Sequence, residues 1–158
     1  MGRFDRVASG VGRAVVLLAA IGCGGGLGPQ EELREDLERA RQKWDASRPA
    51  TYVYAIERLC FCLDEWRGPA RITVVGVDPT ERVYVDTGDP VPMQAEDAFP
   101  SVDGLFAIIE DALDKDAHSV EVIYDPSTGV PLEIRIDYIE LAIDEELGFD
   151  VVEQPTGA

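Results

Sequence analysis

Histidine and basic residues are scarce in this sequence. It has a single histidine, His118, and only 14 Lys and Arg against 31 Asp and Glu, for a net charge of −17. One histidine excludes every site that needs two, including the H-E-x-x-H zinc motif. The acidic excess argues against nucleic acid as a partner, because phosphate binding depends on clustered Lys and Arg. Phosphate-loop and G-x-S-x-G motifs are also absent, so we expect no enzyme and no cofactor.

The sequence also lacks an apolar run long enough to cross a membrane. Its clearest uncharged run covers residues 14–21, which as a helix would span about 12 Å of a ~30 Å bilayer core. Three arginines precede this run, and Gly22 and Cys23 follow it. A basic start, a short apolar core and small residues at its end are typical of a secretory signal peptide.

Residues 20–23, Ala-Ile-Gly-Cys, resemble a bacterial lipobox, in which the signal is cut before a cysteine that receives lipid. The resemblance implies a signal peptide over residues 1–22 and lipid on Cys23. We expect the glycine-rich segment 23–29 to act as a flexible tether. A single domain over 30–153 and a disordered tail over 154–158 complete the expected organisation.

Cys60 and Cys62 are the other two cysteines. An odd number of cysteines leaves a stray thiol in an exported protein, whereas lipid on Cys23 leaves an even pair. Residues i and i+2 of an extended strand lie about 6.6 Å apart, near the upper limit for a disulfide, so a bridge requires a bend at Phe61. We expect a disulfide, with two free thiols or a redox-active or metal-binding pair as alternatives.

The hydrophobic pattern predicts an α+β domain. Apolar residues at helical spacing predict helices over 31–47 and 101–115, the second capped by Ser101. Alternation predicts strands over 51–62, 71–77, 82–86, 120–124, 132–138 and, more briefly, 147–151. We expect residues 78–80 to form a turn and 87–100 a loop. The order α-β-β-β-α-β-β-β predicts an antiparallel sheet of about six strands with two helices on one face.

The predicted first strand places Tyr52, Tyr54 and Ile56 on one face together with Cys60 and Cys62. Glu133, Arg135 and Asp137 alternate with apolar residues in a later strand and are expected to face water.

Several patterns in the chain are similar to those of a family of small bacterial lipoproteins built on a domain of unknown function. The residues that carry this resemblance are Trp44, Tyr52-Val53-Tyr54, Cys60-Phe61-Cys62, Leu105-Phe106, Tyr124-Asp125, Gly129-Val130-Pro131, Ile136-Asp137 and Asp144-Glu145. The resemblance implies export and anchoring and assigns no activity.

The sequence therefore predicts an exported lipoprotein, anchored to the bacterial cell membrane or outer membrane by lipid on Cys23. Its domain is expected to be a non-catalytic module of the envelope, either structural or binding an envelope protein or another envelope component. One alternative is an envelope thiol protein that uses Cys60 and Cys62. Another is an acidic calcium-binding module, with its carboxylates at Glu140, Asp144, Glu145, Glu146 and Asp150.

Overall fold

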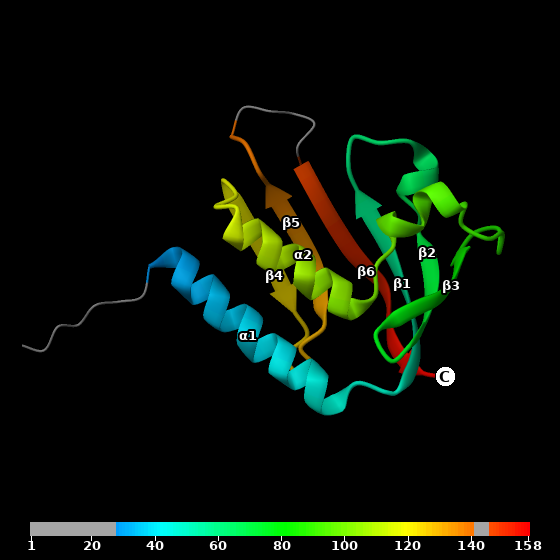
Figure 1. Cartoon of the computed structure of the whole chain (residues 1–158), viewed down its shortest axis with the longest axis horizontal. Coiled ribbons are helices and arrows are strands. Elements are labelled where there is room, and N and C mark those ends of the chain that lie inside the picture. The colour runs from blue at the N-terminus through cyan, green and yellow to red at the C-terminus, as the bar shows by residue number, and fades with distance from the viewer. Residues whose placement is uncertain (1–27, 141–145) are drawn as a thin grey trace, which may run out of the picture.

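The structure is a computed structural model that describes residues 28–140 and 146–158 (Figure 1). The expected signal peptide, Cys23 and most of the tether therefore lie outside the described residues. The elements are α1 Pro29–Ser47, β1 Thr51–Leu59, η1 Asp64–Trp66, β2 Ala70–Val75, β3 Asp78–Tyr84, η2 Met93–Ala98, α2 Val102–Asp114, β4 Ser119–Tyr124, β5 Pro131–Asp137 and β6 Glu146–Gly157. In the described part of the chain, neither helix has the length and apolar character that crossing a membrane requires.

The six strands form one antiparallel sheet in the order β3-β2-β1-β6-β5-β4. Each half of the sheet comes from one helix and the three strands that follow it, and the halves join where β1 pairs with β6. Figure 1 shows α1 and α2 packed on the same side of the sheet. The α+β class, the element order and the placement of both helices on one face are confirmed.

The two helices begin where local chemistry favours a helix start. Pro29 occupies the first turn of α1, where its lack of an N–H costs nothing. The helix therefore starts two residues earlier than expected and takes in the last tether residue. Ser101 caps α2 as predicted, because its hydroxyl accepts a hydrogen bond from the backbone N–H of Gly104.

Three aromatic side chains connect β1 to both helices. Trp44 of α1 packs edge-on against Tyr52, with ring centroids 5.2 Å apart. The Tyr52 hydroxyl accepts a hydrogen bond from the Val102 N–H at the start of α2, at 3.2 Å, and the Tyr54 hydroxyl donates to the Pro100 carbonyl. Burial raises the pKa of Tyr52 to about 12 and raises that of Tyr54 well above its usual value. These residues belong to the core.

Three local predictions are wrong. Residues 78–80 open β3 instead of forming a turn, because Gly76, at a φ of +66°, forms a two-residue hairpin turn with Val77. The loop over 87–100 contains the short helix η2. The tail over 154–158 is not disordered: β6 extends to Gly157, which pairs with Tyr52 in β1.

The turn between β4 and β5 packs directly against α1. Asp125 at its start accepts hydrogen bonds from the hydroxyls and backbone N–H groups of Ser127 and Thr128, and these lower its pKa to about 2. Gly129 ends the turn at a φ of +79°, and a Cβ there would lie 2.1 Å from the carbonyl oxygen of Ala40. Only glycine fits this contact.

We expect Gly129→Ala to lower the free energy of unfolding by about 3 kcal/mol or more, because it adds a clash with α1 to the strain of a positive φ. Gly76→Ala is the matched control: its φ is also positive, and a Cβ there meets nothing within 4 Å. The control should lose about 1 kcal/mol. Urea unfolding of both variants checks this, and equal losses would contradict the proposed contact.

Candidate functional site

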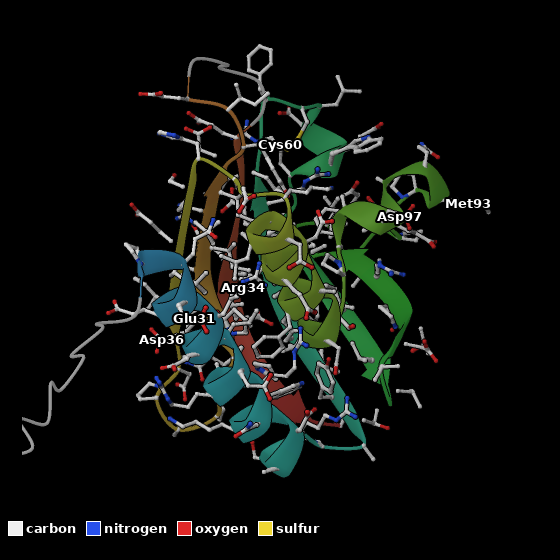
Figure 2. All side chains as sticks on the ribbon, turned by 60° about the vertical axis from the view of Figure 1, so that its left-hand side comes forward. Glu31, Arg34, Asp36, Cys60, Met93 and Asp97 are labelled. Carbon is white, nitrogen blue, oxygen red and sulfur yellow. A yellow bond between two sulfur atoms is a disulfide. The ribbon has the colours of Figure 1, made fainter. Side chains whose placement is uncertain are left out.

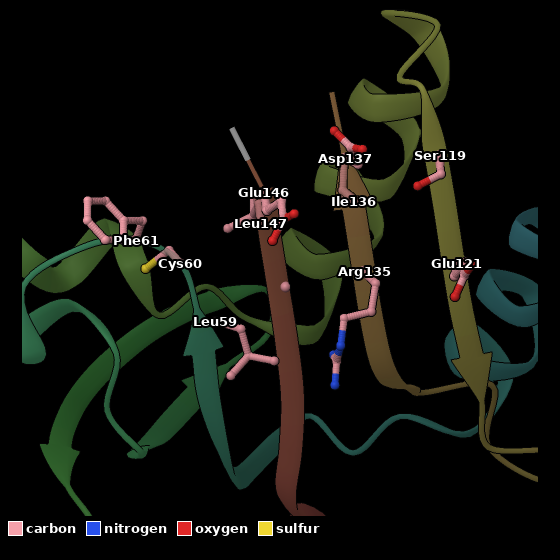
Figure 3. Close-up of a pocket in the computed structure, with 11 residues that line it drawn as sticks. Leu59, Cys60, Phe61, Ser119, Glu121, Arg135, Ile136, Asp137, Glu146 and Leu147 are labelled. Atoms are coloured by element: carbon pink, nitrogen blue, oxygen red, sulfur yellow. The ribbon is translucent and has the colours of Figure 1, made fainter. Parts of the chain in front are cut away.

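The face of the sheet opposite the helices carries a hollow of about 640 Å³. It lies over the ends of β1 and β5 and the starts of β4 and β6 (Figure 3). Side chains from all four strands line it, so the sheet holds its walls in place. Its lining residues are Leu59, Cys60, Phe61, Ser119, Glu121, Arg135, Ile136, Asp137, Glu146, Leu147 and Gly148.

Strand register explains why these residues meet. Glu121 of β4 lies opposite Arg135 of β5, and Arg135 lies opposite Gly148 of β6. Gly148 in turn lies opposite Leu59 of β1. Residues in such a cross-strand row point to the same face of a sheet. A second row, nearer the edge, contains Ser119, Asp137 and Glu146.

Arg135 and Gly148 form the floor of the hollow. The guanidinium of Arg135 lies 2.7 Å from Asp150 and donates hydrogen bonds to the carbonyls of Ile134 and Phe149. A Cβ on Gly148 would lie 2.9 Å from the Ile134 oxygen and 3.3 Å from Cδ of Arg135. The absence of a side chain at Gly148 therefore makes room for the arginine.

The lining combines acidic and apolar groups. Glu121, Asp137 and Glu146 contribute carboxylates, and Leu59 and Phe61 contribute apolar surface. Arg135 also pairs with Asp150 and Glu133, so carboxylates outnumber cationic groups in and around the hollow. The hollow suits a ligand that presents a cationic group beside an apolar one.

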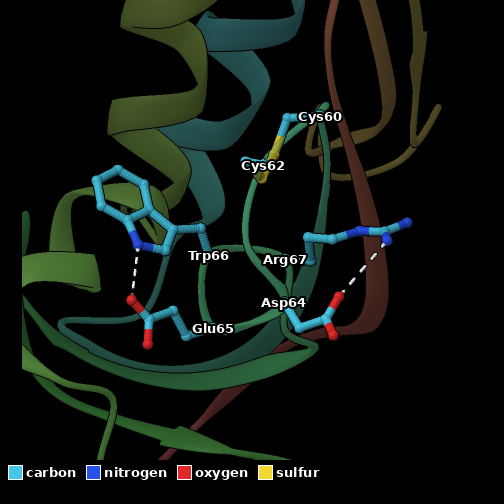
Figure 4. The surroundings of a disulfide bond; sticks show 6 residues. All are labelled: Cys60, Cys62, Asp64, Glu65, Trp66 and Arg67. Carbon is cyan, nitrogen blue, oxygen red and sulfur yellow. Dashed lines mark hydrogen bonds and ion pairs between the residues drawn. A yellow bond between two sulfur atoms is a disulfide. The ribbon is translucent and has the colours of Figure 1, made fainter.

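The structure joins Cys60 and Cys62 by a disulfide at the rim of the hollow (Figure 4). The chain bends over residues 60–62, which brings the two Cα atoms to 5.3 Å. The prediction that the first strand continues to Cys62 is wrong, because β1 ends at Leu59. The cysteines are not in the strand and do not share the buried face of Tyr52.

The carboxylates considered for calcium do not form one site in the described residues. Asp150 pairs with Arg135, Glu140 lies beyond the end of β5, and Glu146 lines the hollow. Asp144 and Glu145 lie outside the described residues. Across residues 28–140 and 146–158, no cluster of three or more His, Cys, Asp or Glu could hold a metal ion.

The sequence correctly placed Arg135 and Asp137 on the water-facing side of their strand, but it did not identify the hollow. The hollow depends on Gly148 lying opposite Arg135, and hydrophobic alternation does not specify that register. The sequence pattern also gave no sign that Arg58 of β1 is partly buried. Its Nε is buried without a hydrogen-bond partner among the described residues, and burial lowers its pKa.

We expect removal of the disulfide by the double change Cys60→Ser and Cys62→Ser to cost about 1.5 kcal/mol of unfolding free energy at most. The bridge closes a very short loop and so removes little entropy from the unfolded chain. Urea unfolding with and without a reductant measures this. The double variant should not respond to the reductant, and a loss of the whole fold would contradict a minor stabilising role.

Comparison with known proteins identifies a family and no activity. No curated protein and no solved structure matches the chain. Residues 36–154 match the model of a family of unknown function, DUF6174. This span begins inside α1 and includes the disulfide, the hollow and nearly all of β6. The chain therefore belongs to the DUF6174 family of unknown function.

Proposed function

We propose that this protein is an exported, lipid-anchored module of the bacterial cell envelope that binds a partner protein on the helix-free face of its sheet. The observation that carries this proposal is the hollow, because it gathers three carboxylates and the apolar side chain of Leu59 on fixed strands. Such a surface favours recognition of a basic segment with an apolar neighbour.

Two features support export. The lipobox-like residues 20–23 provide a cysteine for lipid attachment. The paired Cys60 and Cys62 fit an oxidising compartment, because disulfides persist outside the cytosol. Lipid on Cys23 would also account for the odd number of cysteines.

The charge distribution supports a basic partner. Figure 2 shows the acidic side chains Glu31, Asp36 and Asp97, all exposed, spread over the surface. Such a surface steers cationic partners toward it and slows the approach of anionic ones. The hollow adds apolar contact from Leu59, which would make binding selective for a segment with an apolar side chain beside its basic one.

The intact mass of the protein extracted from bacterial membranes tests export and anchoring. We expect the loss of residues 1–22 and the addition of lipid mass, both abolished by Cys23→Ser. Alkylation of Cys60 and Cys62 should appear only after reduction. A full-length chain without lipid would overturn the proposal, and thiols that react without reduction would favour the thiol-exchange alternative.

Site-specific crosslinking tests the binding face. We expect a photoreactive residue placed at Ser119 to give one discrete adduct in the cell envelope. Asp137→Lys should abolish this adduct, because it reverses a charge inside the hollow. Asp97→Lys makes the same charge change at an exposed position outside the hollow and should leave the adduct intact. If both variants lost the adduct equally, the effect would come from net charge alone and the hollow would not be the binding site.

A further inference from the structure

We propose that Phe61 and Leu63 form an apolar tip that contacts the lipid surface to which the protein is anchored. This inference rests on the proposed lipid anchor at Cys23. It concerns the orientation of the domain on the membrane, which the partner-binding proposal leaves open.

The tip is unusually exposed for apolar side chains. Phe61 is 86% exposed and lies between the two bridged cysteines, and Leu63, which follows Cys62 directly, is 68% exposed. The disulfide restrains the backbone at Phe61 and up to the residue before Leu63, so the Phe61 side chain needs little further ordering to enter an apolar phase. Two large apolar side chains exposed at neighbouring positions of one loop favour contact with an apolar phase.

The tip and the loop that the start of α1 contacts lie at the same end of the sheet. Gln30, in the first turn of α1, donates a hydrogen bond to Asp116 just beyond α2. β4 then begins at Ser119, opposite Asp137 at the end of β5. The start of β6 pairs with this end of β5 and also with the end of β1, from which the tip continues.

The anchor is too short to hold the domain far from the membrane. Pro29 begins α1 only six residues after Cys23, a length that spans at most about 20 Å of extended chain. A short tether gives the tip a millimolar effective concentration at the lipid surface, so a weak contact is enough to orient the domain.

Acidic residues next to the tip determine which lipid headgroups it tolerates. Asp64 and Glu65 follow the tip directly and are exposed, and anionic headgroups would repel them. The tip should therefore favour zwitterionic lipid surfaces, and anionic lipid should weaken the contact. This dependence is opposite to that of a basic membrane-binding patch.

Fluorescence quenching by lipids with brominated acyl chains tests the contact in the full-length, lipidated protein. Phe61→Trp and Leu63→Trp each place an indole at the tip. Val77→Trp is the matched control, because Val77 is 46% exposed in the β2–β3 turn, at the opposite end of the sheet. Trp44 and Trp66 contribute the same background in all three variants.

In vesicles of brominated phosphatidylcholine, we expect at least twofold stronger quenching of the added indole at positions 61 and 63 than at 77. Replacing a third of the lipid with phosphatidylglycerol should reduce the difference. Equal quenching at both ends of the sheet, or none at the tip, in a chain shown by mass to carry lipid overturns this inference alone. A chain without lipid on Cys23 overturns the anchor proposal and this inference together.

Discussion

The fold depends on the contact between β1 and the start of α2, made by the hydroxyl groups of Tyr52 and Tyr54. Both rings are buried, so their hydroxyls need partners, and the backbone around the α2 N-terminus supplies them at Val102 and Pro100. Leaving one buried polar group without a partner costs about 1–3 kcal/mol. Trp44 packs on Tyr52 from α1. One central strand thus fixes both helices on the same face and leaves the other face of the sheet uncovered by helices.

Within the described residues, arginines mostly join one structural element to another. Arg34 and Arg41 connect α1 to α2. Arg71 of β2 pairs with Glu153 of β6, and Arg135 of β5 pairs with Asp150 of β6. Exposed pairs of this kind contribute little stability individually. These arginines already pair with carboxylates of the domain, so most of the other acidic side chains in the described part of the chain have no basic side chain beside them. The carboxylates of the hollow would then be available to the basic partner proposed above.

Local patterns determined most of what could be predicted. Helical spacing and the Ser101 cap located α2, and strict alternation located β5 and its water-facing Arg135. The errors came from long-range pairing. The C-terminal half of β6 alternates poorly in sequence and contains Pro155, yet it is a strand because β1 pairs with it. For the same reason the hollow could not be predicted, because it requires three strands to align around Gly148.

The hollow and the joining of the two halves of the sheet depend on the same strand, β6. β6 pairs with β1 on one side and with β5 on the other, so it joins the two halves of the sheet. Gly148 lies within both pairings, with Leu59 on one side and Arg135 on the other. Neither half alone can make the hollow, because its walls come from both. Loss of β6 pairing would therefore separate the apolar wall from the acidic one, and the proposed recognition of a segment that is both basic and apolar would require the complete sheet.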